Sequence, residues 1–478
     1  MSDLELCYLP ATEAIKRFKA KTLSPVELLE ALIKRTEEVD PVINAFTYRH
    51  FDEAMANAKK AEAKYASGKR ARTLEGLPIG IKDENFIKGK PTSNGSLIMK
   101  NFVADTTSVG NERILRAGGI VHARTATPEF SSAGYTHSRL WGVTRNPWNP
   151  EFTPGGSSGG SAASLAAGTS AIATGSDIGG SIRIPAAACG LVGYKPPYGR
   201  NSDDPPFNLD FYCHTGPLAR NVSDAILLQN VMCGPHPKDM ASLRPKLRLP
   251  AHYPPIKNWK IAFSMDLGFF EVDPDVQKNT LKALEVFRDL GATVEEVDLG
   301  WDHRALDAGI AYLSHIFGAY MATYLADHAD KMTNYVREWA QKAQKSTSAD
   351  FLQTLEVANE MYATVGPLLE KYQVLVCPTN ALPAVPADFD HSTDALSING
   401  RQVNPILGWV MTTPFNSLSR CPVLTLPTGR ASNGVPTSIQ IVGRTYTDKD
   451  VFQAGMAYES VAPGWFAQNG VRPDILGG

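Results

Sequence analysis

The chain has 478 residues, 43% of them hydrophobic and 20% charged, which is the composition of an ordinary globular protein and excludes a disordered one. Its 47 Lys and Arg residues against 49 Asp and Glu residues give a formal net charge of −2, and no basic block or stripe indicates a surface for nucleic acid or an anionic membrane. Residues 1–5 are acidic where a secretory signal would be basic, and no apolar run approaches the roughly 18 residues of a membrane span. We therefore expect a soluble cytoplasmic protein.

The spacing of cysteine and histidine indicates neither a disulfide framework nor a metal site. Six cysteines are scattered without a C-x-x-C pair, and ten histidines show no H-E-x-x-H arrangement. We expect reduced thiols and no bound metal.

Helical spacing dominates the first part of the chain. Ser24 to Glu27 combine a capping box with proline at the first helical position, and apolar residues follow at helical intervals. Helices are also expected over residues 11–20 and 51–66. We therefore expect a helical N-terminal layer over residues 1–70, whose helices are a candidate surface for pairing two copies into a homodimer.

The strands that we predict fit one α/β domain. Residues 77–81 form a short apolar run that ends in Lys82, which indicates a buried strand with a lysine at the end where α/β sheets bind ligands. A strand, a helix and a strand follow in that order over residues 260–299, which predicts parallel pairing. Later strands are expected at 374–377, 423–426 and 438–442, with a closing helix from about residue 450.

These elements predict a single large domain over residues 1–478, with a twisted mixed β-sheet core covered by α-helices on both faces, although length alone would suggest two or three domains. Residues 300–370 read as a mainly helical, variable region bordering the substrate pocket. Its aromatic side chains, Tyr312, Phe317, Tyr320 and Tyr324, are expected to pack a core in preference to lining that pocket.

Two glycine-rich clusters in the first half of the chain each present a serine, Ser157 within 155–160 and Ser181 within 179–183. Glycine lets the backbone approach a ligand closely, so such clusters suit turns that hold N–H groups around a developing oxyanion. Taken alone, such a stretch is more often a linker or a phosphate loop, but the phosphate-loop motif with its lysine is absent. The G-x-S-x-G string at 155–159 also matches a nucleophile elbow, which needs a preceding strand that the prolines before it would break.

The two clusters together with Lys82 resemble the amidase signature family. The resemblance is carried by residues 76–83, 146–148, 154–161, 175–185, 189–190, 193–196 and 216–220, and more weakly by 378–379, 422–429 and 440–443. It implies a signature core over residues 76–225 that carries a Ser-Ser-Lys triad.

In that triad Ser181 would be the nucleophile, Ser157 the bridging serine on a cis Gly156–Ser157 peptide bond, and Lys82 the base. The resemblance further implies an oxyanion hole made by backbone N–H groups, and it places Ser131 at the acyl pocket, where an ordinary loop serine is the alternative. The oxyanion donors would be Ile178, Gly179, Gly180 and Ser181.

The residues allow this chemistry on one condition. A serine hydroxyl needs a base within hydrogen-bond reach, and lysine serves only when it is neutral, so burial must lower the pKa of Lys82 from about 10.4 to near 7. The predicted function is hydrolysis of a small-molecule carboxylic amide through a Ser181 acyl-enzyme that releases ammonia or an amine, without a metal or organic cofactor. Aryl esters and carbamates share this chemistry.

Two alternatives stay open. The first is a glutaminase-type subunit of an aminoacyl-tRNA amidotransferase; such subunits usually carry an arginine in the helix before the late strand, and residues 361–366 contain none. The second is a catalytically silent binding protein, which would be favoured by loss of a triad member. Beside the triad, Asp83, Asp177 and Arg183 are interpreted as structural ion pairs, and Cys189 as a packed thiol.

Overall fold

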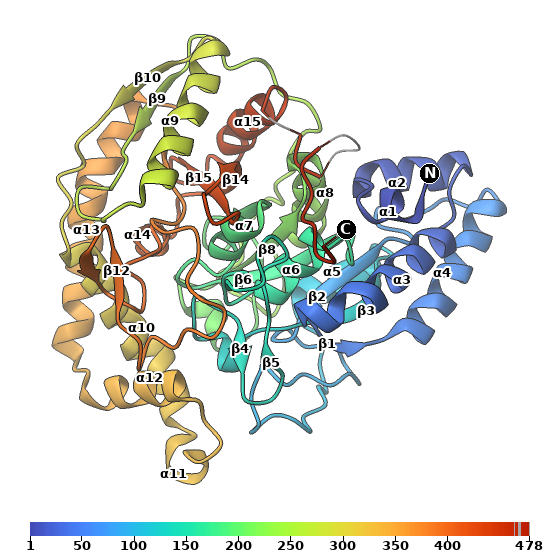
Figure 1. Ribbon diagram of the computed structural model, residues 1–478, viewed down its shortest axis with the longest axis horizontal. Coiled ribbons are helices and arrows are strands. Elements are labelled where there is room, and N and C mark those ends of the chain that lie inside the picture. The colour runs from blue at the N-terminus through green and yellow to red at the C-terminus, as the bar shows by residue number, and fades with distance from the viewer. Residues whose placement is uncertain (463, 467–469, 478) are drawn as a thin grey trace.

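The computed structural model describes residues 1–462, 464–466 and 470–477. A mixed sheet of 11 strands forms its centre (Figure 1). In spatial order the strands are β1 (Phe46–Arg49), β3 (Ile120–Thr125), β2 (Pro78–Lys82), β6 (Ile172–Asp177), β8 (His214–Ala219), β7 (Val192–Lys195), β14 (Val423–Arg430), β15 (Pro436–Gly443), β11 (Val374–Pro378), β9 (Lys260–Phe263) and β10 (Thr293–Glu296). Two small hairpins pair β4 (His137–Ser138) with β5 (Gly142–Val143) and β12 (Leu396–Ile398) with β13 (Arg401–Val403).

Over the described residues, fifteen α-helices surround the sheet. They are α1 (Asp3–Cys7), α2 (Ala11–Ala20), α3 (Pro25–Ile43), α4 (Phe51–Ala66), α5 (Val109–Arg116), α6 (Gly159–Ala166), α7 (Arg183–Cys189), α8 (Val222–Met232), α9 (Pro274–Asp289), α10 (Arg304–Ala322), α11 (Leu325–His328), α12 (Asn334–Lys345), α13 (Ser348–Lys371), α14 (Pro414–Ser417) and α15 (Asp448–Glu459). The predicted helices over 11–20 and 51–66 are confirmed, and the capping box at Ser24 starts α3 as expected.

The pairing of the strands brings two chain segments to one edge of the sheet. β2 lies between β3 and β6 and is parallel to both, so Lys82 and the end of β6 emerge on the same side. At the other end of the sheet β9 is parallel to β10 and to β11, which confirms the predicted strand-helix-strand unit around α9. β8, β7, β14 and β15 join the two parallel parts through antiparallel pairs.

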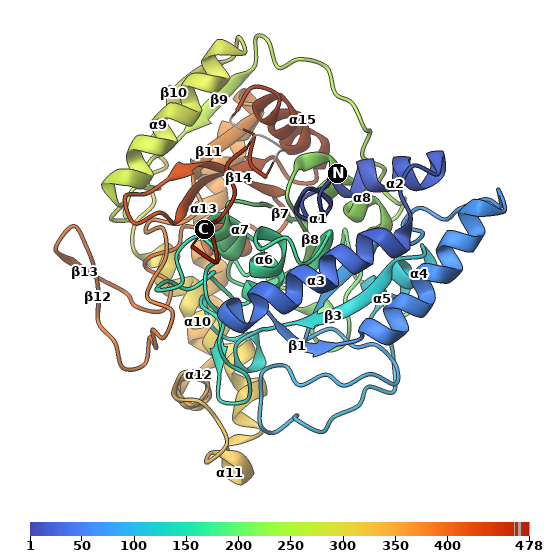
Figure 2. The same cartoon turned by 45° about the vertical axis from the view of Figure 1, so that its right-hand side comes forward.

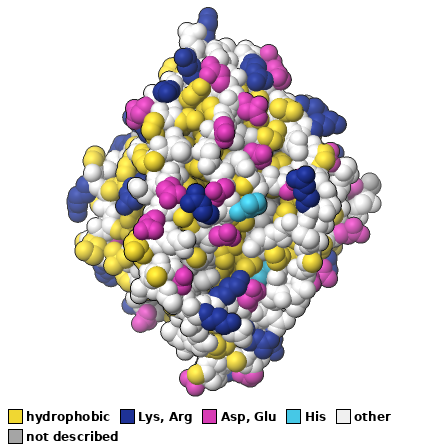
Figure 3. All heavy atoms as spheres, turned by 90° about the vertical axis from the view of Figure 1, so that its left-hand side faces the viewer, with side chains coloured by type: hydrophobic (Ala, Val, Ile, Leu, Met, Phe, Trp, Pro, Cys, Tyr) yellow, Lys and Arg dark blue, Asp and Glu magenta, His cyan; other side chains and the backbone are white. Residues whose placement is uncertain are grey.

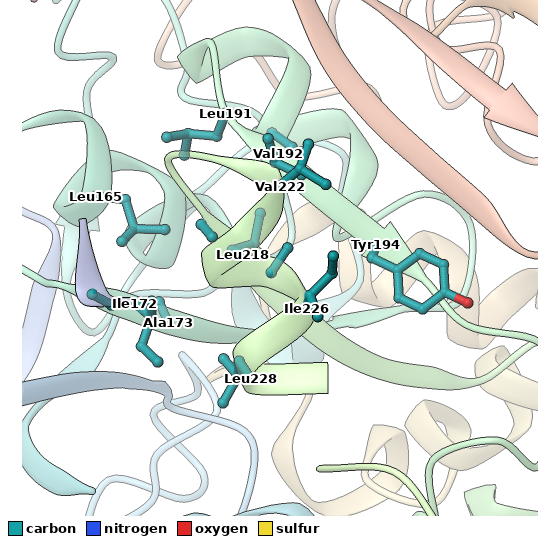
Figure 4. Packing of buried hydrophobic residues seen from close by; sticks show 14 of the residues in the cluster. Leu165, Ile172, Ala173, Leu191, Val192, Tyr194, Leu218, Val222, Ile226 and Leu228 are labelled. Carbon is teal, nitrogen blue, oxygen red and sulfur yellow. The ribbon is translucent and has the colours of Figure 1, made fainter. Parts of the chain in front are cut away.

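Helices cover both faces of the sheet, as predicted. Along β11, Val374 and Val376 enter one hydrophobic core, whereas Leu375 and Cys377 enter another, because successive side chains of a strand point to opposite faces. The first core is completed by α8, α9 and α15, and the second by α10, α12 and α13. Part of the first core is shown in Figure 4, where leucine, isoleucine and valine side chains from α6, β6, β7, β8 and α8 interdigitate.

The N-terminal layer contains a strand as well as helices. α1 to α4 lie together at one end of the molecule, and α3 and α4 run beside β1 and β3 (Figure 2). Between them β1 pairs antiparallel with β3 and forms the edge of the sheet. The expected layer over residues 1–70 therefore contributes one edge strand to the central sheet, which the sequence analysis did not predict.

On the face seen in Figure 3, Lys and Arg side chains lie interspersed with Asp and Glu, without a field of one sign. No helix in the described ranges combines the length and the apolar composition needed to cross a membrane.

Candidate active site

Lys82 ends β2 in the interior of the protein. Its side chain is fully buried, and its backbone N–H donates a hydrogen bond to the hydroxyl of Thr174 on β6 at 3.2 Å. In its charged form the Nζ atom donates to Ser157 Oγ and to Ser176 Oγ, each at 2.7 Å. It also lies 2.7 Å from Glu84 Oε2, with which it forms an ion pair. The apolar run before Lys82 therefore delivers the amine to a polar cluster of two hydroxyls and one carboxylate.

Ser157 lies on the loop that precedes α6. The Gly156–Ser157 peptide bond is cis, as the resemblance implies. A Cβ atom at Gly156 would overlap the carbonyl oxygen of Tyr135, so this approach of two backbone segments requires glycine. The Ser157 hydroxyl is buried and faces Lys82.

Ser181 lies on the loop between β6 and α7, next to the Ser157 loop. The backbone N–H of Ser158 donates to the carbonyl oxygen of Ser181 at 3.2 Å, which holds the two glycine-rich segments together. Within the described part of the chain the Ser181 hydroxyl makes no hydrogen bond, and it lines a cavity. The structure thus brings Lys82 and Ser157 into direct contact and joins the Ser181 loop to the Ser157 loop through a backbone hydrogen bond.

The backbone around Ser181 presents unpaired donors. Among the described residues, the N–H groups of Ile178, Gly179, Gly180 and Ser181 donate no hydrogen bond. The carbonyl oxygen of Gly179 accepts hydrogen bonds from the hydroxyls of Thr412 at 2.7 Å and Thr413 at 3.1 Å. Because the C=O and N–H of a trans peptide point in opposite directions, these bonds turn the N–H of Gly180 away from the threonines. Buried N–H groups without partners are rare in proteins, and an oxyanion would satisfy them.

The loop that carries these donors is closed at its base by a buried ion pair. Arg183, the first residue of α7, donates to both carboxylate oxygens of Asp177, the last residue of β6, at 2.9 Å each. Burial alone would raise the pKa of the Asp177 carboxyl, but the guanidinium of Arg183 and the Asn416 amide hold it well below its usual range. Asp177 and Arg183 therefore form a structural pair, as predicted, and their position also fixes both ends of the Ser181 loop.

The cavity beside the triad has two chambers. The larger, of about 160 Å³, is lined by Ser157 and by aromatic side chains, and the smaller, of about 30 Å³, is lined by Ser181. Ser131, Ile178 and Phe317 line both, so Ser131 stands at the boundary between the two chambers. A larger hollow, of about 670 Å³ between the N-terminal helices and α15, contains none of the triad residues.

The helical region 300–370 borders this cavity. Leu313 and Phe317 of α10 and Trp339 of α12 line the smaller chamber, and Phe317 and Tyr320 line the larger one. Tyr312 instead packs into the core, stacked on Tyr212 with ring centroids 3.7 Å apart. Phe317 and Tyr320 pack against the same core as expected, but they also line the cavity, which the sequence analysis did not favour, because one face of α10 is turned toward the triad.

The electrostatics of the cluster shift the pKa of Lys82 in the direction that the proposed chemistry requires. Burial lowers the pKa of the Lys82 amine, and the carboxylate of Glu84 partly offsets this effect. Burial by itself would raise the pKa of Glu84, but the Lys82 amine and the hydroxyls of Ser176 and Ser131 bring it below its ordinary value. Glu84 is therefore a carboxylate beside an amine whose proton affinity is reduced.

Sequence reasoning missed Glu84, Ser176, Thr412 and Thr413. Glu84 carried a usable signal, because it is an acidic residue only two positions from Lys82, in the turn that directly follows β2. The other three have none that we can find, since a serine in β6 and threonines over 200 residues away meet the site only through the fold. In the described ranges, no group of three or more His, Cys, Asp or Glu side chains could hold a metal ion.

Comparison with known proteins assigns this chain to a family. Residues 27–452 match the family model described as Amidase. The chain is 32% identical over 470 residues to an acylamidase of Rhodococcus erythropolis, with 97% of each chain covered. It is also 31% identical over 484 residues to a glutamyl-tRNA(Gln) amidotransferase subunit of Cyanothece sp., covering 94% of this chain and 97% of that one.

Among solved structures, a bacterial aryl acylamidase of the amidase signature enzymes superposes with a TM-score of 0.89 at 30% identity, covering 96% of this chain and 97% of that chain. The chain therefore belongs to the amidase signature family and is a hydrolase that acts on carbon–nitrogen bonds.

Proposed function

We propose that this protein hydrolyses small carboxylic amides with Ser181 as nucleophile and with Ser157 and Lys82 as the proton relay. The observation that carries the proposal is the 2.7 Å hydrogen bond between Lys82 and Ser157, next to a serine whose loop offers four unpaired N–H groups. A neutral lysine can accept a proton from Ser157 while Ser157 accepts one from Ser181.

The reaction then proceeds in two half-reactions. The Ser181 oxygen attacks the amide carbon, and the N–H groups of residues 178–181 stabilise the oxyanion. The relay returns the proton to the nitrogen, the carbon–nitrogen bond breaks, and ammonia or an amine leaves the acyl-enzyme. A water molecule gives a proton to the same relay, attacks the acyl carbon and releases the carboxylic acid, which restores Ser181. Aryl esters and carbamates are expected substrates because they pass through the same tetrahedral intermediate.

The charge of the cavity supports an amide without a carboxylate group. Among the described residues that line the two chambers, none is Lys or Arg, whereas Glu84, Asp177, Asp203 and Asp204 are acidic. The α-carboxylate of glutamine would therefore meet no cation there. The helix that holds residues 361–366 lines neither chamber.

The glutaminase alternative rests on the relatives named as amidotransferase subunits, and it is tested directly. The purified chain is assayed with a panel of aryl and alkyl amides and with glutamine, and ammonia or amine release is measured. Hydrolysis of the amides by the chain alone supports the proposal, whereas activity with glutamine only in the presence of partner subunits would replace it. The homodimer and the cytoplasmic location stay predictions, the former testable by light scattering.

The roles of the triad residues are tested by substitution and by labelling. Ser181→Ala should abolish both turnover and covalent labelling by a sulfonyl fluoride, and Lys82→Met should lower kcat by about 10²- to 10⁴-fold. Ser164→Ala, which changes a buried serine of α6 that lines neither chamber, is the matched control and should keep wild-type turnover. Full activity in Ser181→Ala would show that the nucleophile is assigned wrongly.

A further inference from the structure

Glu84 lines the larger chamber and also contacts the residues of the proton relay. Its Oε2 atom lies 2.7 Å from Lys82 Nζ and accepts hydrogen bonds from the hydroxyls of Ser176 at 2.7 Å and Ser131 at 2.9 Å. Ser176 is in turn an acceptor for Lys82. Glu84, Lys82 and Ser176 therefore form a closed network, and the lysine amine has Ser157 as its further partner.

We infer that Glu84 is a positioning residue for the catalytic base, which directs the lone pair of Lys82 at Ser157 and stabilises the ammonium that forms when the proton arrives. The inference rests on the proposed function and adds a fourth member to the relay. Its logic is that of the aspartate in a Ser-His-Asp triad, which orients the base and compensates its charge without taking the proton itself.

The hydrogen-bond partners of Lys82 fix the direction of its lone pair. A neutral lysine has two N–H groups and one lone pair, and Nζ has three close partners at 2.7 Å: Ser157, Ser176 and Glu84. A carboxylate accepts hydrogen bonds and cannot donate one, and the Ser176 hydroxyl already donates to Glu84. Both N–H groups are therefore committed to Glu84 and Ser176, and the lone pair is left facing the hydroxyl of Ser157.

The network also compensates the positive charge of the protonated lysine. When Ser157 passes its proton to Lys82, the ammonium has three N–H groups and three acceptors in place, one of them a carboxylate. Hydrogen bonds in which both partners are charged are about twice as strong as neutral ones. Glu84 therefore lowers the free energy of the protonated lysine, which exists while the oxyanion is present.

Other titratable and charged groups lie near Glu84 and Lys82. These are Asp177 on β6, Cys213, His214 and Asp203 in the wall of the larger chamber, Tyr320 on α10, and Asp83 with Arg124 behind β2. Asp177 is ionised throughout the range tested, and burial keeps the Cys213 thiol neutral by raising its pKa and keeps His214 neutral by lowering its pKa to about 3.

Two carboxyl groups in that set could add a titration of their own. Burial, with Asp204 as a close negative charge, raises the pKa of Asp203 to about 7, and burial raises that of Asp83 to about 6. Asp203→Asn therefore separates this second titration from that of Lys82, since Asp203 makes no contact with Lys82, although the negative charge of Glu84 contributes to the raised pKa of Asp203.

The test is the pH dependence of kcat/KM for a chromogenic anilide in wild type, Glu84→Gln, Glu84→Asp and Asp203→Asn. Lys82 acts when neutral, so activity falls at low pH as the lysine gains a proton. Removing the negative charge of Glu84 favours the neutral amine, and Glu84→Gln should move the acid limb to lower pH by about one to three units. The plateau kcat should fall by about tenfold or more, because lowering the pKa of the ammonium by about one unit corresponds to a factor of ten in its stability.

Glu84→Asp keeps the negative charge, so the acid limb of its profile should lie close to the wild-type pH. Its kcat should nevertheless fall. In Asp203→Asn the acid limb of the kcat/KM profile should still report the titration of Lys82. An unchanged limb in Glu84→Gln, or an equal shift in Glu84→Asp, would overturn the inference, because charge would then not be the cause. Melting temperatures are measured for all variants, and Glu84→Asp decides the question if Glu84→Gln does not fold.

Labelling of Ser181 by a sulfonyl fluoride, followed by intact mass against pH, separates this inference from the function on which it rests. If the wild type neither hydrolyses the anilide nor labels at Ser181, the proposed function fails and the inference fails with it. If the wild type does both and the labelling rate of Glu84→Gln keeps the wild-type limb, the inference about Glu84 fails alone.

Discussion

Replacing Asp177 with asparagine would test how the Ser181 loop is held. Asp177 and Arg183 stand at the two ends of residues 178–182, and both side chains are fully buried. Asn416 donates a further hydrogen bond to Asp177 Oδ1 at 2.8 Å. The variant keeps the size of the side chain and removes the charge, so Arg183 stays buried without a counter-ion.

The expected cost follows from the surroundings of Arg183. Removing one partner of a buried ion pair destabilises proteins by about 3–5 kcal/mol. The guanidinium would still donate to the carbonyl oxygen of Thr412 at 2.9 Å and to the side-chain oxygens of Gln440 at 3.0 Å and Asn416 at 2.7 Å. Because these acceptors satisfy part of its hydrogen-bonding capacity, we expect the lower end of the range, about 3 kcal/mol.

Urea unfolding followed by tryptophan fluorescence measures the loss, and turnover of an anilide measures displacement of the loop. Glu360→Gln is the matched control, since it breaks an exposed ion pair with Arg304 and should cost less than about 1 kcal/mol. If Asp177→Asn lost no more stability than that control and kept its turnover within twofold, the pair would not be holding the loop.

Three further predictions concern the backbone, pH and thiols. Gly180→Ala should lower kcat at least tenfold without preventing folding, because its Cβ would overlap the Thr412 hydroxyl that orients the donor loop; wild-type kinetics would contradict this. Burial lowers the pKa of His122 to about 4 and of His214 to about 3, so the unfolded state binds protons below pH 6.5 that the folded state does not. The stability present above pH 6.5 should therefore fall toward pH 4 by about 3 kcal/mol for each histidine, as urea unfolding at several pH values would show, and a flat profile would contradict it. Cys189 is fully buried with its thiol pKa raised by burial, so iodoacetamide at pH 8 should leave it unmodified by mass spectrometry.

The sequence was most informative where local patterns decide local structure. The apolar run before Lys82 predicted a buried strand, and β2 ends at that lysine. Caps and helical spacing predicted α3 with its start at Pro25. Strands β6, β7 and β8 were not predicted, because each contains a glycine, β6 also contains Ser and Asp, β8 also contains Pro, and β7 has only four residues. They are strands because neighbouring strands on both sides satisfy their backbone.

The residues of the site likewise fall into two groups, those that local sequence patterns predict and those that only the fold brings together. Glycine clusters and the lysine can be found from sequence because each fixes a local turn or strand end. The threonines that orient the Gly179 peptide lie on a loop before α14, and their contact depends on the path of the whole chain between them. The lining of the cavity by Phe317 and Tyr320 depends on how α10 is rotated, which hydrophobic spacing alone does not fix when both faces of a helix are apolar.

A second buried lysine shows what makes Lys82 suitable as a base. Lys195 on β7 is also fully buried, and burial lowers its pKa to about 7. Its Nζ donates to the carbonyl oxygens of Cys421 at 3.0 Å and Ser419 at 3.3 Å, and a carbonyl oxygen has no proton to give. Lys82 instead contacts the hydroxyl of Ser157, which can give a proton to the lysine and accept one from a neighbour. Burial lowers the proton affinity of both lysines. Of the two, Lys82 also contacts a hydroxyl, which supplies a route for the proton.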